Sequence, residues 1–424
     1  MKTKSSVLDK AKIILSNGCI CNNCLGRQFA QLLSGYDNET RGKTIRTTLA
    51  FEQELKEDKK LDKSNFSDYK FRQNKIKTLD KKTCYVCDGI FEKTNQIIKK
   101  ASFEVEDLEF NTFHVGATLS ENLLKNEESL WEEAGIDYVE SIKTEISRVC
   151  GKKLQTVLKK EVDLKHPEIV ILINLEKNAI ELTINSIYLY GKYKKLKAMP
   201  QTKWHCQECR GLGCKVCNYT GRKYNTSVQE KIEELALKVT EGIDAKFHGA
   251  GREDVDVLCK GHREFVLELI EPKKRNIDIK KLEKDINKKY KGEIEIINLK
   301  ITDKDTVKQI KEKKSNKTYH AVIELNDDIK KEDVKNLEEL IGVINQQTPK
   351  RVAHRRADII RKRSVLSLTA KYINKRQIKA DITTEAGMYI KELVSGDDGR
   401  TRPSVSSILG VKAKIEKLDV TEID

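Results

Sequence analysis

The chain has 424 residues and a formal net charge of +15, from 81 Lys and Arg against 66 Asp and Glu. This length fits two to three domains of roughly 100–200 residues each, and no apolar run approaches the ~18–20 residues that would span a bilayer. The only apolar stretch near the start contains Asp9, which argues against a signal peptide and for a cytoplasmic protein. The positive surplus favours a polyanionic partner such as nucleic acid, although a solvated lysine-rich surface would give the same charge.

The first part of the chain, residues 1–100, combines a short predicted helix with two cysteine pairs. Apolar residues recur at helical spacing within Ser6–Ser16, and Asn17-Gly18 ends the pattern. One pair is Cys21-x2-Cys24 and the other, about sixty residues later, is Cys84-x2-Cys87. Neither pair fills a tetrahedral site alone, so we expect the four thiols to share one zinc that clamps the segment between them. Two unrelated reduced pairs are the alternative, and Cys19 could compete as a ligand.

The segment between these pairs, residues 55–82, is rich in Lys and Asp and is expected to be a solvated excursion.

The next region, residues 101–198, mixes helix and strand patterns. Thr118-x-x-Glu121 predicts a capping box, and Gly135 predicts the end of that helix. Apolar runs at residues 169–175 and 180–184 predict a hairpin. It leads into YGKYKKLK at residues 190–197, a basic strip with aromatics that suits RNA, although a solvated lysine-rich strand fits nearly as well.

A second cysteine group lies in residues 199–223, which we expect to be a zinc ribbon that links the two halves as a hinge. Its four cysteines are spaced as two CxxC pairs, at Cys206, Cys209, Cys214 and Cys217. Such spacing is typical of a closed structural zinc site, with a disulfide pair as the alternative. The chain is therefore expected to hold two structural zinc ions. The single Cys150 and Cys259 are expected to be ordinary buried thiols.

The last part, residues 224–424, begins with a helix capped by Ser227-x-x-Glu230 and continues in alternating apolar segments typical of strands. Strands mixed with helices, without a regular crossover period, favour an α+β fold. No phosphate-binding or nucleophile-elbow motif is present, and Gly249-Ala250-Gly251 carries Asp254 where a dinucleotide loop needs its third glycine. The sequence therefore indicates no organic cofactor and no nucleotide cofactor.

Several long strings resemble the pseudouridine synthase superfamily, and within it the archaeal-type tRNA pseudouridine synthases that carry a THUMP domain. They are CNNCLGRQFA at 21–30, YGKYKKLKAMPQTKWHC at 190–206, FHGAGREDVDV at 247–257, QQTPKRVAHRRAD at 346–358 and GMYIKELVSGDDGRTRPSVSSILG at 387–410. The resemblance implies a pseudouridine synthase catalytic domain with a mixed or antiparallel sheet, preceded by a zinc-clamped, THUMP-containing α/β accessory domain. It also implies isomerisation of uridine in the TΨC arm of tRNA, at positions 54 and/or 55.

The resemblance assigns roles to particular residues. Asp254, in Gly-Arg-Glu-Asp, is the implied catalytic aspartate, and Lys391 the basic residue that pairs with it. Tyr319 is implied to stack on the target base and to assist proton removal, and Leu393 to lie under the uracil. The residues expected to hold RNA are Arg252, Arg351, Arg355, Arg356, Lys192 and Lys194. The chain departs from its relatives at Leu258-Cys259-Lys260 and at Glu264, which could alter RNA contacts.

The implied reaction breaks the N1–C1′ bond of a uridine, turns the uracil and rejoins it through C5. It needs one ionised carboxylate, which either attacks the sugar or removes a C2′ proton. Burial would neutralise an aspartate, and a neighbouring lysine would oppose this. The alternative function is a catalytically inactive, zinc-containing tRNA-binding or tRNA-chaperone protein. An intact set of Asp254, Tyr319 and Lys391 favours the enzyme, acting as a monomer on tRNA.

Overall fold

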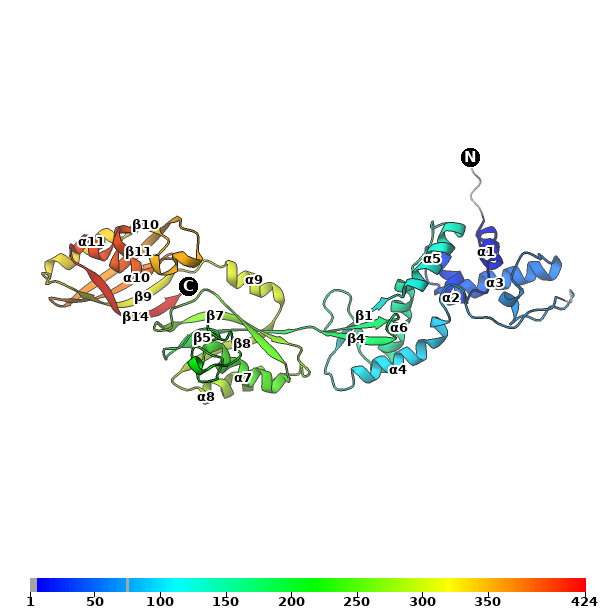
Figure 1. The fold of residues 1–424 in the computed structure, drawn as a ribbon, viewed down its shortest axis with the longest axis horizontal. Helices are drawn as coiled ribbons and strands as arrows, with labels where there is room; N and C mark the ends of the chain where they lie inside the picture. Colours follow the sequence, from blue (N-terminus) through cyan, green and yellow to red (C-terminus); the bar gives the residue numbers. More distant parts are fainter. Residues whose placement is uncertain (1–5, 74–75) are drawn as a thin grey trace, which may run out of the picture. The chain divides into compact units, whose positions relative to one another are not determined.

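The computed structural model describes residues 6–73 and 76–424, apart from the side chain of Arg355. The chain divides into two compact units, residues 1–185 and residues 186–424, each of which is described by itself (Figure 1). Within the described ranges, no helix is both long and apolar enough to cross a membrane.

The first unit combines helices with a four-stranded sheet in the order β2-β1-β3-β4. Its strands are β1 (Thr112–Thr118), β2 (Glu161–Val162), β3 (Ile169–Asn174) and β4 (Ala179–Ile184). Its helices are α1 (Val7–Ser16), α2 (Asn22–Gly26), α3 (Asn38–Leu55), α4 (Thr94–Glu104), α5 (Glu121–Ala134) and α6 (Ile142–Leu158). One hydrophobic core runs through both the helical part and the sheet of this unit.

The local patterns predict most of these elements. Ser6 caps α1 by accepting a hydrogen bond from the backbone of Asp9. The predicted hairpin is present, because β3 and β4 pair antiparallel. The cap of α5 is Ser120, whereas Thr118 is the last residue of β1, so the predicted capping box is wrong while the helix itself is present. Gly135 ends α5 with a φ of 73°, which a residue without Cβ adopts at no steric cost.

The segment at residues 55–82 is more packed than its composition suggests. Leu61 and Phe66 are buried, and the side chain of Asn65 donates hydrogen bonds to the backbone of Leu15 and Gly18. Two apolar residues and one asparagine are enough to anchor this polar segment on α1. The expectation of a wholly solvated excursion is therefore wrong for this part, and residues 74–75 lie outside the described ranges.

The second unit is built on one ten-stranded sheet in the order β13-β10-β11-β12-β9-β14-β7-β5-β8, with β6 paired to β7. The strands are β5 (Ile187–Lys195), β6 (Asp244–Gly249), β7 (Leu258–Ile270), β8 (Ile294–Thr302), β9 (Lys317–Leu325), β10 (Gly342–Gln347), β11 (Ile360–Asn374), β12 (Gln377–Thr384), β13 (Thr401–Arg402) and β14 (Ala413–Ile423). The helices are α7 (Val228–Thr240), α8 (Ile279–Lys289), α9 (Lys304–Glu312), α10 (Ile390–Ser395) and α11 (Val405–Leu409). All pairings are antiparallel except that of β14 with β7, so the sheet is mixed, as expected.

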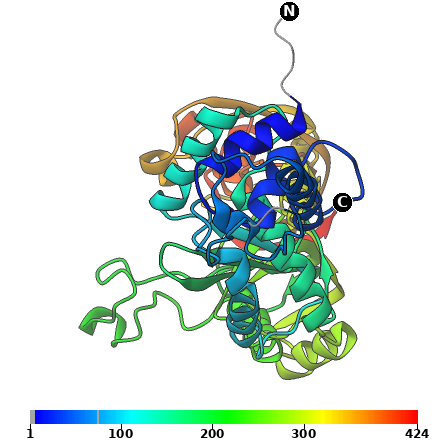
Figure 2. The same ribbon diagram turned by 90° about the vertical axis from the view of Figure 1, so that its right-hand side faces the viewer.

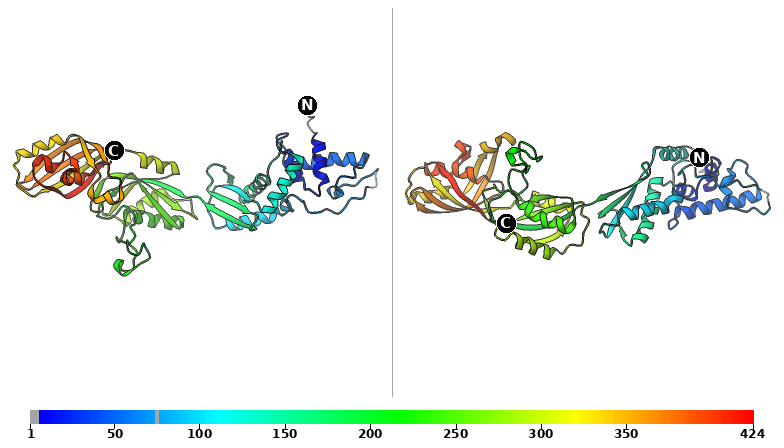
Figure 3. Two further views of the ribbon diagram at one scale, coloured as in Figure 1. Left: turned by 45° about the horizontal axis from the view of Figure 1, so that its top comes forward. Right: turned by 60° about the horizontal axis from the view of Figure 1, so that its bottom comes forward.

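The division between the units differs from the expected boundary at residue 198. Strand β5 pairs with β7 and β8 of the second unit, and its residues Ile187, Leu189 and Tyr193 are buried there. The loop with the second cysteine group therefore follows a strand of the second unit and precedes α7 of the same unit. It is an excursion from that unit rather than a hinge between halves, and Figures 2 and 3 show it extending away from the sheet.

Candidate active site

The turn between β6 and β7, residues 250–257, lies at a cleft of about 720 Å³ in the second unit. Residues far apart in the sequence line this cleft because the sheet brings β7, β9 and β14 together, with α10 and the short 3₁₀ helix Lys350–Arg355 beside them. The polar and aromatic lining residues used below are Trp204, Arg252, Asp254, Tyr319, Arg351, Arg356 and Lys391. The structure thus brings Asp254, Tyr319 and Lys391 to one cleft.

The carboxylate of Asp254 is flanked by two cations. The ammonium of Lys391 lies 3.2 Å from Asp254 Oδ2, and the guanidinium of Arg351 lies 3.5 Å from the same oxygen. The side chain of Asp254 is 42% exposed, so the burial that the implied chemistry led us to expect is slight. Solvent access leaves the side chain of Asp254 open to a substrate in the cleft.

Lys391 is shared between two carboxylates. Its ammonium also donates hydrogen bonds to Asp256, at 3.2 Å to Oδ1 and 3.0 Å to Oδ2. Burial lowers the pKa of Lys391, but the hydrogen bond to Asp256 and the charge of Asp254 outweigh it, so the pKa is raised above its usual range. The lysine is therefore protonated at neutral pH. Asp256 is a residue of this cluster that the sequence patterns did not identify.

Tyr319 stands on β9 and is half-buried in the wall of the cleft. Burial raises the pKa of its hydroxyl to about 12, so the phenol keeps its proton at neutral pH. The expected apolar partner, Leu393, does not line the cleft. It is fully buried in the core of the second unit, and the apolar residues Met388 and Ile390 line the cleft in its place.

The six residues expected to hold RNA do not all line the cleft. Arg252 and Arg351 line the cleft, as does Arg356, which donates a hydrogen bond of 2.8 Å to the hydroxyl of Tyr389. The side chain of Arg355 lies outside the described part of the structure. Neither Lys192 nor Lys194 lines the cleft, and Lys194 pairs instead with Glu295 at 3.3 Å. Successive strand residues point to opposite sides of a sheet, and the residues of β5 on the inward side are Tyr193 and Lys195.

A buried carboxylate next to Asp254 organises the turn. Glu253 accepts a hydrogen bond of 3.0 Å from the hydroxyl of Tyr193, and its other oxygen lies 2.8 Å from Nε of Arg263. The ammonium of Lys195 lies 3.7 Å from Oε1 of Glu253. All four side chains are buried, and the negative charge of Glu253 keeps the pKa of Arg263 raised although burial lowers it. Sequence reasoning did not find this network.

The same network holds the backbone that carries Asp254. Lys195 donates a hydrogen bond of 3.0 Å to the carbonyl of Asp254, and Arg263 donates one of 2.9 Å to the carbonyl of Ala250. Gln201 donates one of 3.0 Å to the carbonyl of Gly251, whose φ of 80° suits glycine. The main chain on both sides of the catalytic candidate is therefore held by buried side chains, while the side chain of Asp254 lines the cleft.

Two groups of four cysteines could each hold a metal ion. They are Cys21, Cys24, Cys84 and Cys87 in the first unit, and Cys206, Cys209, Cys214 and Cys217 in the second, with all sulfurs of a group within 4.8 Å. The sulfur atoms of Cys209 and Cys217 are 3.8 Å apart, close to the ~3.8 Å edge of a tetrahedron with ~2.3 Å Zn–S bonds. Cys19 lies outside the first group, and Cys150 and Cys259 are buried single thiols, as expected.

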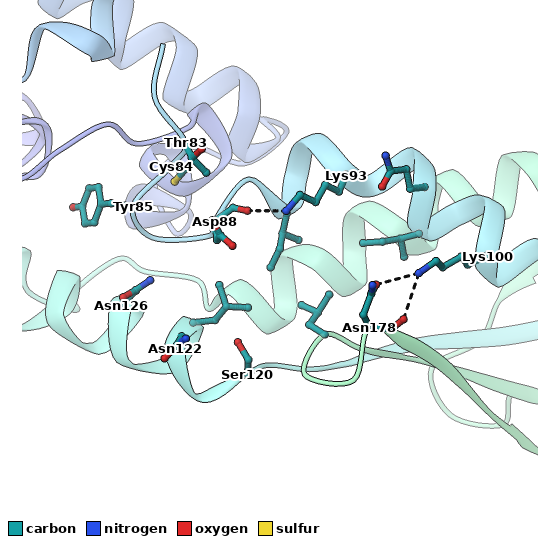
Figure 4. Close-up of a pocket in the computed structure, with 15 residues that line it drawn as sticks. Thr83, Cys84, Tyr85, Asp88, Lys93, Lys100, Ser120, Asn122, Asn126 and Asn178 are labelled. Atoms are coloured by element: carbon teal, nitrogen blue, oxygen red, sulfur yellow. Dashed lines mark hydrogen bonds between the residues drawn. The ribbon is translucent and has the colours of Figure 1, made fainter. Parts of the chain in front are cut away.

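A further cavity of about 780 Å³ lies in the first unit, beside α4 and α5 (Figure 4). Lys93 and Lys100 line it, and each donates to a carbonyl oxygen at 3.4 Å, of Asp88 and Asn178 respectively. Asn122 and Asn126 complete a lining of amides. No carboxylate–ammonium pair like that of Asp254 and Lys391 occurs among the described residues of this cavity. Its lining therefore suits the binding of a polar group rather than a reaction at a paired carboxylate.

Comparison with known proteins shows matches over nearly the whole chain. The family model described as "Pus10, C-terminal" matches residues 188–424, and that described as "Pus10 THUMP domain, archaeal" matches residues 97–174. The tRNA pseudouridine synthase Pus10 of Methanothrix thermoacetophila is 36% identical, over 99% of this chain and 95% of the relative. That of Methanocaldococcus jannaschii is 40% identical, over 97% and 93%. A solved Cbf5-Nop10-Gar1 complex matches at 16% identity over 54% of this chain and 47% of its own, with a TM-score of 0.29.

The network around Glu253 predicts a large loss of stability when its charge is removed. Glu253→Gln leaves Arg263 and Lys195 buried without their counter-charge, which costs roughly 3–5 kcal/mol when one partner of a buried pair is lost. We expect the free energy of unfolding of the second unit, measured by urea titration, to fall by that amount. The matched control is Glu295→Gln, which removes a half-exposed partner of Lys194 on the outward side of the same strand and costs about 0–1 kcal/mol. Equal losses in the two variants would contradict the assigned role of Glu253.

Proposed function

This chain belongs to the Pus10 family of tRNA pseudouridine synthases, and we propose that its Asp254 cleft isomerises uridine in the TΨC arm of tRNA, at position 54, position 55 or both. The observation that carries the proposal is the carboxylate of Asp254 in a cleft that Tyr319 lines, with the ammonium of Lys391 3.2 Å away. A protein that only binds tRNA has no need of this combination.

The carboxylate of Asp254 initiates the reaction, either by attacking the sugar or by removing its C2′ proton. The N1–C1′ bond breaks, the uracil turns within the cleft, and C5 bonds to C1′ as the bond from Asp254 to the sugar breaks or the C2′ proton returns. The C5 proton then leaves and N1 takes up a proton, so the composition of the RNA is unchanged. The protonated Lys391 and the guanidinium of Arg351 fix the position of the carboxylate from two sides. No electron transfer or phosphoryl transfer is required.

The target base is stacked in folded tRNA and must leave its helix to reach Asp254, at a cost of a few kcal/mol that contacts in the pocket offset. Tyr319 with Met388 and Ile390 supplies an aromatic and apolar wall for the extruded uracil. The hydroxyl of Tyr319 keeps its proton at neutral pH, so it acts on the substrate first as a hydrogen-bond donor. Arg252, Arg351 and Arg356 place positive charge at the cleft for the flanking phosphates.

The acting form is proposed to be a monomer, and all the residues that line the cleft belong to the second unit. The first unit, with its matched THUMP segment and its cavity, is proposed as a further contact for tRNA. The two four-cysteine groups are proposed to hold one structural zinc each, because four thiolates at these separations satisfy a tetrahedral ion and leave no position open for substrate. Zinc would therefore support the fold and not the isomerisation.

Replacement of Asp254 tests the proposed chemistry. Asp254→Asn keeps the size of the side chain but removes the charge that the reaction needs, so we expect pseudouridine formation to be abolished while tRNA still binds. Carbodiimide mapping of an unmodified tRNA transcript after incubation measures the product. Asp256→Asn is the matched comparison in the same turn, because it contacts the same lysine without lining the cleft, and we expect it to lower activity without abolishing it. Modification by Asp254→Asn at the wild-type level would exclude this assignment.

Replacement of Tyr319 separates its two proposed roles. Tyr319→Phe keeps the ring that stacks on the uracil but removes the hydroxyl, so we expect KM to change little and kcat to fall about 10²-fold or more. Steady-state kinetics of tritium release from C5-tritiated uridine in tRNA gives both constants. A variant with unchanged kcat would show that the tyrosine is only a stacking platform.

Elemental analysis tests the metal proposal. We expect about two zinc ions per chain, since each four-cysteine group offers one complete tetrahedral site. Cys24→Ser and Cys217→Ser should each lose one zinc, whereas Cys19→Ser should keep both, because its sulfur donates to the carbonyl of Lys82 and lies outside the group. Fewer than one zinc per wild-type chain would contradict both sites.

A further inference from the structure

A second, smaller hollow adjoins the cleft of Asp254. It has a volume of about 300 Å³ and lies at the base of the cysteine loop formed by residues 203–224. Trp204 lines both the hollow and the cleft, so the two spaces meet at its indole. The hollow is too small for a helix of RNA and has room for one nucleotide base.

The aromatic wall of this hollow carries two cations. Trp204 packs edge-on against Tyr224, with ring centroids 5.6 Å apart. The guanidinium of Arg252 lies 4.6 Å from the centroid of Trp204, and the ammonium of Lys223 lies 5.3 Å from it. Among the described residues, neither Arg252 nor Lys223 forms an ion pair with a carboxylate. Both charges are therefore available to a phosphate.

The other cations of the hollow are already neutralised. Arg222 pairs with Glu230 at 2.5 Å, and Lys203 pairs with Glu233 at 2.6 Å. These pairs tie the base of the loop to α7 and make a polar rim, while Trp204 remains half-buried with the two unpaired cations near its ring. A half-exposed aromatic face with free cations beside it is the arrangement that binds an unpaired base together with its phosphate.

We propose that the Trp204 hollow is a second nucleotide site, which holds an unpaired base next to the target uridine in the RNA. This inference rests on the proposed function, because the target must lie at Asp254 for its neighbour to reach Trp204. On binding, the base replaces the guanidinium of Arg252 on the indole, and Arg252 and Lys223 contact the backbone phosphates. The segment that contains the cysteine loop leaves the sheet after β5 and returns to the second unit at α7 (Figure 3).

The first test uses the fluorescence of the indole. The chain has two tryptophans, so the double variant Trp131→Phe, Asp254→Asn leaves Trp204 as the sole emitter in a protein that does not turn over. Titration with an unmodified tRNA transcript, with binding followed separately by filter retention, should quench the emission as the complex forms. Complete binding without a change in emission would overturn the inference. A protein that binds no tRNA would overturn both the inference and the proposed function.

The second test compares protein and RNA variants in one cycle. Trp204→Leu should raise KM about tenfold with kcat little changed, because stacking on one base contributes about that much, whereas Trp204→Phe should stay within about threefold of wild type. A transcript with an abasic ribose beside the target uridine, on the 5′ or the 3′ side, should raise the KM of the wild type by a similar factor and that of Trp204→Leu hardly at all. The control is Tyr219→Ala, a 70% exposed residue of the same loop outside the hollow, which should not change KM.

Equal abasic penalties in the wild type and in Trp204→Leu, for both flanking positions, would overturn the second site while leaving the isomerase intact. The zinc content of each variant is measured in parallel. If the loop collapses, the variant loses zinc and Trp204→Phe shows a similar rise in KM, whereas the loss of stacking alone gives neither effect. In contrast, a wild-type chain that forms no pseudouridine in any transcript would refute the proposed function itself.

Discussion

Glu253 is buried between Arg263 and Lys195, and the position of its neighbour Asp254 depends on this contact. The two cations use their remaining donors to hold the carbonyls of Ala250 and Asp254, so a single buried charge fixes the backbone on both sides of the reactive residue. Burying three charged groups is costly unless they are paired and hydrogen-bonded. Here Glu253 is paired with both cations, and each cation also donates a hydrogen bond to the backbone of the turn.

The adjacent carboxylates of Glu253 and Asp254 therefore have different roles in this turn. Glu253 is enclosed and contacts the protein, whereas Asp254 is 42% exposed and is the residue proposed to act on the substrate. Lys391 and Arg351, from segments more than ninety residues further along the chain, reach Asp254 from the cleft side. The site is assembled only when the sheet brings β7, β9 and β14 together, which is why the chemistry belongs to the second unit as a whole.

The sequence predicts the parts of this site that are written in short motifs. The cysteine spacings indicate both four-thiol groups, and the resemblance identifies Asp254, Tyr319 and Lys391, which the structure places at one cleft. The motifs do not predict which residues of a strand point toward the core. The basic strip suggests Lys192 and Lys194 for the site, but the inward side of β5 carries Tyr193 and Lys195, in step with Ile187 and Leu189. The position of Lys195 on the same side of β5 as buried apolar residues was the sequence signal for the network around Glu253.

Other differences arise from contacts between distant segments, which local patterns do not encode. The sequence groups strand β5 with the preceding hairpin, but its partners β7 and β8 lie more than sixty residues later. The resemblance places Leu393 under the uracil, yet Leu393 is fully buried in the core of the second unit, and Met388 and Ile390 line the cleft instead. In both cases the contacts with distant segments, and not the local pattern, decide where the side chain lies.

The most direct measurement is mass-spectrometric mapping of nucleosides in an unmodified tRNA transcript incubated with the purified full-length chain and no added cofactor. We expect pseudouridine at position 54, position 55 or both, without a change in the mass of the RNA. A transcript recovered with all its uridines intact, under conditions in which the protein binds it, would contradict the claim that Asp254 and its neighbours form an isomerase site.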